Sequence, residues 1–87
     1  MAPAGTPLED RHMSTQHLMA TLAPNPRLDG TAADIAVRTW EFAADMLVML
    51  ADGQELSAGL RKLREAKDCL VIQGLADSGV IAAPPGL

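Results

Sequence analysis

The sequence predicts an all-α fold: an antiparallel helical hairpin with a short N-terminal helix, which assembles into a helical-bundle homo-oligomer. Hydrophobic residues make up 48% of the chain, yet only Trp40 and Phe42 are aromatic. The Ala, Leu and Met that supply most of the rest are good helix formers. Few segments combine β-branched residues with a period of two, so strands are not expected. Two long segments with apolar residues every three or four positions flank a turn signal at Asp52-Gly53, which is typical of two helices folded back on each other.

Length and cysteine count indicate what could support such a fold. A chain of 87 residues makes one small domain with a thin core. Domains of this size often add a disulfide, a metal or a partner subunit. Cys69 is the only cysteine, which excludes an internal disulfide, and one Cys with two His is a poor zinc set. We therefore expect no metal and no cofactor, and self-association as the remaining support.

The net charge of −4 disfavours binding to DNA or RNA, which requires a basic surface. It leaves room for a small anionic ligand held by a few local cations. No apolar run reaches about 18–20 residues, so a membrane span is not expected. The first residues have neither the basic region nor the apolar core of a signal peptide. Together with a free thiol, these features predict a protein of the cytoplasm.

Residues 1–9 are expected to form a disordered arm, because they carry prolines and a glycine but no periodic apolar pattern. The hairpin domain is placed at 10–79, with its first helix at about 11–22. Pro24 ends that helix and begins a stiff, extended connector. Arg27 in this connector is a candidate contact for an anion; the alternative is a plain linker with an exposed arginine.

The second helix, expected at about 32–51, is apolar around most of its circumference. Its charged residues keep to one narrow stripe. Two apolar seams run beside that stripe, one with Ala36, Trp40, Ala43, Leu47 and Leu50 and the other with Ile35, Phe42, Met46 and Met49. A single partner helix covers only one seam. Leaving the other in water forfeits several kcal/mol at about 25 cal/mol per Å2, so hairpins are expected to associate into a bundle.

The connection after the second helix is short, so the two long helices must be antiparallel neighbours. Gly53 suits a left-handed residue that closes the second helix. Asp52 and Glu55 have the spacing of a capping box for the third helix, expected at about 55–77.

Lys67 falls inside the apolar seam of the third helix. It is either a residue at the edge of the seam with its stem along the apolar surface, a member of a buried ion pair, or an anion ligand. Residues 80–87 are expected to form a flexible tail.

The chain carries no catalytic pattern. It has no glycine-rich phosphate loop, and the serine and histidines of the first helix do not make a triad. Cys69 sits among apolar neighbours, as an inert thiol does. An enzyme needs convergent polar groups in a pocket, so we expect a protein that is not an enzyme.

The hairpin resembles a family of small phage proteins. The resemblance covers about residues 20–77. It rests on Ile35-Ala-Val-Arg-Thr-Trp-Glu-Phe-Ala-Ala-Asp-Met-Leu, which follows a proline-containing segment, and on Gly53-Gln-Glu-Leu-Ser-Ala-Gly-Leu-Arg-Lys-Leu-Arg-Glu-Ala. Proteins of this family sequester cyclic oligonucleotides, silence cyclic-oligonucleotide-based antiphage signalling (CBASS) and so serve immune evasion. They share a helical hairpin domain with anti-Thoeris-type relatives.

The resemblance implies dimers or higher oligomers, up to hexamers, that hold signalling nucleotides between subunits without turnover. The family uses its proline-containing segment and basic residues at the start of the second helix, which here correspond to Pro24 and Arg38. The first hypothesis is therefore a sponge for a cyclic di- or trinucleotide. Arg38 and Arg27 would pair with phosphates, Trp40 would stack a base or pack in the core, and Lys67 is a further candidate. The alternative is a structural or protein-interaction module without a nucleotide, whose apolar seam binds a partner helix.

Overall fold

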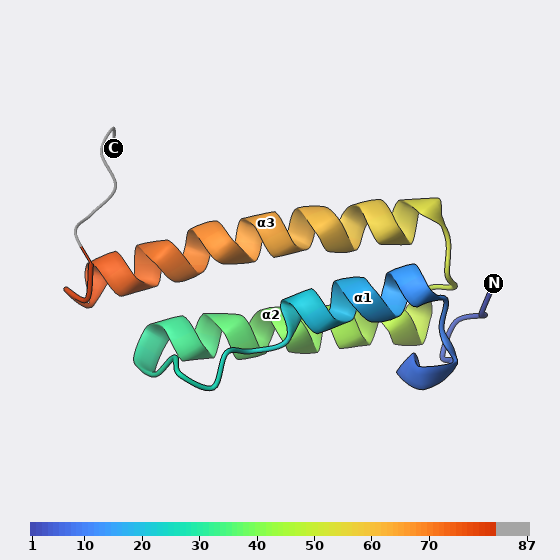
Figure 1. Cartoon of the computed structure of the whole chain (residues 1–87), viewed down its shortest axis with the longest axis horizontal. Coiled ribbons are helices and arrows are strands. Elements are labelled where there is room, and N and C mark those ends of the chain that lie inside the picture. Colours follow the sequence, from blue (N-terminus) through green and yellow to red (C-terminus); the bar gives the residue numbers. More distant parts are fainter. Residues whose placement is uncertain (82–87) are drawn as a thin grey trace.

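The computed structural model describes residues 1–81 and is all-helical, as predicted. A 3-10 helix, η1 (Leu8–Asp10), precedes three α-helices: α1 (Met13–Leu22), α2 (Gly30–Met49) and α3 (Gln54–Asp77) (Figure 1). The described residues contain no strand. The three α-helices begin and end within two residues of the expected bounds. None of the described helices is both long enough and apolar enough to cross a membrane.

The core lies where the three α-helices meet. α2 and α3 lie side by side and run in opposite directions, and α1 packs against both (Figure 1). The buried cluster draws on all three helices: Leu18, Met19, Leu22, Ala43, Leu47, Leu56 and Leu60. Of the first seam of α2, Ala43 and Leu47 belong to the core but Leu50 is 45% exposed. Phe42 and Met49 of the second seam are exposed as well.

The turn between α2 and α3 differs from the expected capping pattern. α2 ends because Leu50 adopts an extended backbone, with φ −124° and ψ 141°. Gly53 has φ 174°, an extended conformation that any residue can adopt. The prediction of a left-handed residue at this position is therefore wrong. The capping box is absent as well, since α3 has no side-chain cap. The Asp52 carboxylate instead accepts a hydrogen bond from the backbone N–H of His12, which precedes α1.

Residues 1–9, expected to be a disordered arm, lie against the end of α2. The N–H of Gly5 donates to the carbonyl of Leu47 at 2.9 Å, and the N–H of Asp52 donates to the carbonyl of Ala2 at 2.8 Å. Gly5 has φ 79°, a left-handed conformation that favours glycine. Backbone hydrogen bonds hold this segment, together with Leu8, which packs against the core cluster. A single apolar contact leaves no periodic pattern in the sequence.

α3 ends where the sequence places its end. Gly79 has φ 77°, its N–H donates to the carbonyl of Ala76, and the N–H of Val80 donates to the carbonyl of Leu75. These two bonds form a Schellman motif with glycine at its left-handed position. Of the flexible tail expected at 80–87, only Val80 and Ile81 are among the described residues.

Candidate functional site

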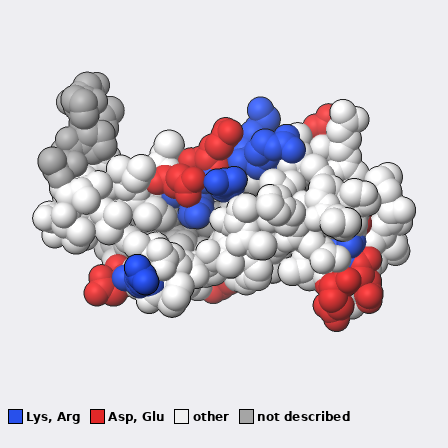
Figure 2. All heavy atoms as spheres, in the orientation of Figure 1, with Lys and Arg blue, Asp and Glu red and all other residues white. Residues whose placement is uncertain are grey.

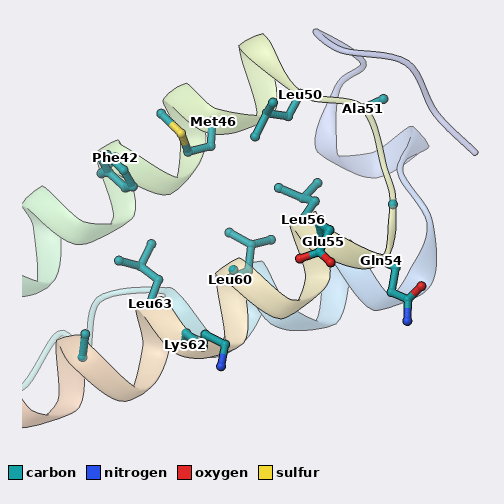
Figure 3. A pocket seen from close by; sticks show the side chains of 13 residues that line it. Phe42, Met46, Leu50, Ala51, Gln54, Glu55, Leu56, Leu60, Lys62 and Leu63 are labelled. Atoms are coloured by element: carbon teal, nitrogen blue, oxygen red, sulfur yellow. The ribbon is translucent and has the colours of Figure 1, made fainter.

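An open apolar groove lies between α2 and α3, close to the turn that joins them (Figure 3). It has a volume of about 810 Å3, and α1 contributes nothing to its lining. Its apolar lining consists of Phe42, Met46, Leu50, Ala51, Leu56, Gly59, Leu60, Leu63 and Ala66, and the remaining lining residues are Gly53, Gln54, Glu55 and Lys62. We call this feature the α2–α3 groove.

Helical spacing explains the two walls of the groove. Residues three or four positions apart share one face of a helix. The α2 wall follows this spacing with Phe42, Met46 and Leu50, and the α3 wall follows it with Leu56, Leu60 and Leu63. Figure 3 shows the two sets pointing toward one another from opposite helices. Phe42 nevertheless remains 51% exposed, so the side chains of this chain do not close the groove.

Two residues on the α3 wall of the groove have little or no side chain. Gly59 and Ala66 lie seven positions apart on the lining face of α3. A Cβ atom at Gly59 would meet no atom within 4 Å. The space above this part of α3 is therefore free for a side chain from elsewhere.

Charges stay at the edge of the groove. The Lys62 side chain lines the groove, but its nitrogen points away from the α2 wall (Figure 3). On the face in Figure 2, basic side chains gather over the middle of α3 with acidic ones beside them, rather than forming a continuous basic surface. Among the described residues, no group of three or more His, Cys, Asp or Glu is arranged to hold a metal. This lining favours binding of another apolar surface.

The five residues that the sequence nominates as ligand contacts do not line the groove. Pro24 is half-buried and Arg27 is exposed, both in the connector between α1 and α2, and Arg38 is exposed on α2. Lys67 lies on α3, where its Nζ is 3.0 Å from the Asp68 carboxylate and its side chain is 14% exposed. Trp40 packs against the buried core.

Phe42, rather than Trp40, is the exposed aromatic of α2. Sequence reasoning placed Phe42 in a seam that needs a cover but did not nominate it as a contact. It lies one helical turn after Arg38, so the two side chains are neighbours on the helix surface. The signal was present in the sequence as the second seam, of which the single chain leaves Phe42 and Met49 exposed.

A second cluster, centred on Asp52, is buried and polar. The Arg11 and Asp52 side chains are 0% and 2% exposed, and their closest atoms, Nη1 and Oδ1, are 3.4 Å apart. Thr15 Oγ1 donates to Oδ1 at 2.7 Å, and the N–H groups of His12 and Ala2 donate to Oδ2 at 2.7 and 3.3 Å. This cluster is structural, because it joins the N-terminal segment and α1 to the turn.

Arg11 also satisfies backbone carbonyls at the end of α2. Its guanidinium donates to the carbonyl of Leu50 at 2.9 Å, to the carbonyl of Leu47, and to the carbonyl of Thr6 at 3.0 Å. The last carbonyls of a helix have no partner within the helix, and a cation there is favourable. No buried side-chain nitrogen or oxygen among the described residues lacks a partner.

The surroundings of Asp52 change its acidity. Burial alone would raise the pKa of the carboxyl. Hydrogen bonds from His12, Thr15, Ala2 and Arg11 outweigh burial and lower the pKa from 3.8 to about 2. Asp52 is therefore ionised at neutral pH, where it serves as a fixed acceptor for these donors.

Comparison with protein-family models, curated proteins and solved structures finds no match to this chain.

Proposed function

We propose that this chain is a non-enzymatic protein-interaction module that binds an apolar helix in the α2–α3 groove. The observation that carries the proposal is the groove itself, with apolar walls from two helices and charges only at its edge. Proteins commonly recognise amphipathic helices by laying the apolar face into such a groove. No turnover is required, since the lining supplies an apolar surface rather than converging acids and bases.

The exposed surface is large enough to matter energetically. Phe42 is 51% exposed, Leu50 45% and the adjoining Met49 61%. Together they leave on the order of 300 Å2 of apolar surface in water, about the size of the largest apolar patch on a typical monomer, which is often functional. At about 25 cal/mol per Å2, covering it is worth roughly 7 kcal/mol before the cost of association. A small domain has a net stability of about 5–15 kcal/mol, so this surface favours a partner.

The groove can be tested with an apolar fluorescent dye, anilinonaphthalene sulfonate, at a submicromolar concentration of the chain. We expect dye fluorescence to fall at least fivefold in Phe42→Glu, because a carboxylate in the groove repels the dye and admits water. Gly59→Leu should have the same effect by filling the open space at Gly59.

Val48→Glu is the matched control, since Val48 is an exposed apolar residue of α2, 68% exposed, that does not line the groove. Circular dichroism should show the same helix content in all three variants. Equal fluorescence of Phe42→Glu and Val48→Glu would refute binding in the groove.

A second candidate function is sequestration of a cyclic oligonucleotide signal in the bacterial cytoplasm, as the resemblance implies. The observation that favours it is the pair of exposed neighbours Arg38 and Phe42 on α2. A guanidinium pairs well with a phosphate, and an exposed aromatic ring stacks on a base. In this candidate Phe42 takes the stacking role that the sequence suggested for Trp40, while Arg27 and Pro24 supply contacts from the connector.

This candidate predicts binding of cyclic di- or trinucleotides in isothermal titration calorimetry. Arg38→Glu is expected to weaken binding at least tenfold, because a hydrogen bond to a charged group is worth about 1.5–3 kcal/mol. Arg61→Glu, an equally exposed arginine on α3, controls for the change in net charge. An absence of heat across a panel of both ring sizes would exclude the candidate.

A further inference from the structure

We propose that the occupant of the α2–α3 groove is a second copy of this chain, in a two-fold homodimer whose core contains α2 and α3 of both copies. This inference rests on the proposed function, because it assumes that the groove binds a helix. It adds the identity of the partner and the register of the two copies.

The apolar surface extends beyond the groove along both helices. Met49, 61% exposed, lies seven residues after Phe42, and Leu70, 56% exposed, lies seven residues after Leu63. Residues seven apart lie on nearly the same side of a helix. The result is an apolar face along an antiparallel pair of helices, which is wider than one foreign helix covers. An identical pair matches it, because four helices packed around such faces form a bundle core.

The part of the α3 wall that carries Gly59 and Ala66 leaves room for a side chain of the partner. The position above Gly59 is open in this chain, and Ala66 repeats a small side chain two turns later. A side chain from a facing helix can enter this space. In a two-fold dimer it does so twice, once on each copy.

The charges beside the groove favour one arrangement of the copies. The solvent edge of α2 carries the exposed acids Glu41 and Asp45, and the edge of α3 carries Lys62. Glu41 lies eleven residues before Asp52 and Lys62 ten residues after it, so both stand at nearly the same height above the turn. A two-fold axis parallel to the helices places α2 of one copy over α3 of the other, with both turns at the same end. Lys62 of each copy then faces Glu41 of its partner, with Asp45 one turn to one side of Glu41 and Arg38 one turn to the other.

Light scattering between about 1 and 200 µM tests the dimer. The mass should rise toward twice the 9.2 kDa of one chain, and dye fluorescence per chain should fall over the same range as the partner covers the groove. Phe42→Glu should raise the dissociation constant at least 50-fold. Met13→Glu, on α1, 80% exposed and outside the groove, should leave it within about threefold. Lys62→Glu should weaken the dimer about fivefold, Glu41→Lys combined with Lys62→Glu should restore it, and Arg61→Glu should have little effect.

Each outcome decides between the two proposals. A monomeric mass at 200 µM overturns the homodimer, and groove-dependent dye binding at that concentration would leave the interaction module standing with a different partner. If the chain stays monomeric and its dye fluorescence does not change in Phe42→Glu, both the homodimer and the interaction module are overturned. A dimer or larger assembly that Phe42→Glu leaves intact overturns the interface proposed here. If Glu41→Lys combined with Lys62→Glu does not restore the dissociation constant, the proposed register of the two copies is overturned.

Discussion

Replacing Asp52 with asparagine is expected to lower the free energy of unfolding by about 3–5 kcal/mol at pH 7, the usual cost of leaving a buried charge without its partner. The change removes the negative charge beside Arg11, whose side chain is fully buried. Both oxygens of Asp52 accept hydrogen bonds. Asparagine replaces one of these acceptors by an NH2 group, which cannot accept. Urea unfolding followed by circular dichroism measures the effect.

The same variant should also flatten the dependence of stability on acid. The pKa of Asp52 is lowered on folding, from 3.8 to about 2. Its contribution is therefore complete above 3.8 and is lost as the pH falls toward about 2. Over this window the free energy of unfolding of the unmodified chain should fall more than that of Asp52→Asn, so the two curves should approach each other.

Asp45→Asn, an exposed carboxylate of α2, is the control and should stay within about 0.5 kcal/mol of the unmodified chain. A difference between Asp52→Asn and the unmodified chain that remains constant from about pH 5 to pH 2 would contradict the role given to the Asp52 carboxylate.

Leu22→Ala is expected to destabilise the fold by about 2–5 kcal/mol, the range for buried leucines. Leu22 is 0% exposed and belongs to the cluster that joins α1 to α2 and α3. In a domain of this size, each kcal/mol shifts the melting temperature by about 4–8 °C, so a fall of roughly 8–40 °C should appear in a thermal scan.

The control on the same helix is Met13→Ala. Met13 is 80% exposed, and its truncation should shift the melting temperature by only about 2–4 °C. A comparable fall in both variants would mean that α1 is not held by the core cluster.

The helices could be predicted from the sequence because their signals are local. Apolar spacing located all three within two residues, and Gly79 marked the end of α3. These features depend on residues within one or two helical turns of each other. The two seams of α2 separated only in part. Ala43 and Leu47 of the first are buried but its Leu50 is 45% exposed, and Ile35 and Met46 of the second are half-buried.

The role of Asp52 could not be predicted in the same way. Its spacing to Glu55 matches a capping box, but its partners Ala2, Arg11 and Thr15 lie 50, 41 and 37 residues away. No local sequence pattern predicts contacts between residues so far apart in the chain. The N-terminal segment was misjudged for the same reason, since its proline and glycine content says nothing about carbonyl groups at the end of a distant helix.

The candidate site was only partly visible. The sequence indicated that the seam with Phe42 and Met46 needed a cover, and the groove lies along that seam. It could not decide which aromatic is exposed, because Trp40 and Phe42 differ by 200° around one helix and both faces are apolar. Only the folded arrangement, in which Trp40 packs against the core cluster and Phe42 stays exposed, distinguishes them.

The bonds of the N-terminal segment also constrain the making of the protein on the ribosome. Ala2 and Arg11 are synthesised 36–50 residues before the groups that they bind. At about 5–20 residues per second, they wait roughly 2–10 s for those partners to emerge. A segment rich in apolar side chains would be prone to aggregation or to chaperone binding during that interval. Residues 2–7, Ala-Pro-Ala-Gly-Thr-Pro, have no large apolar side chain to expose during this interval.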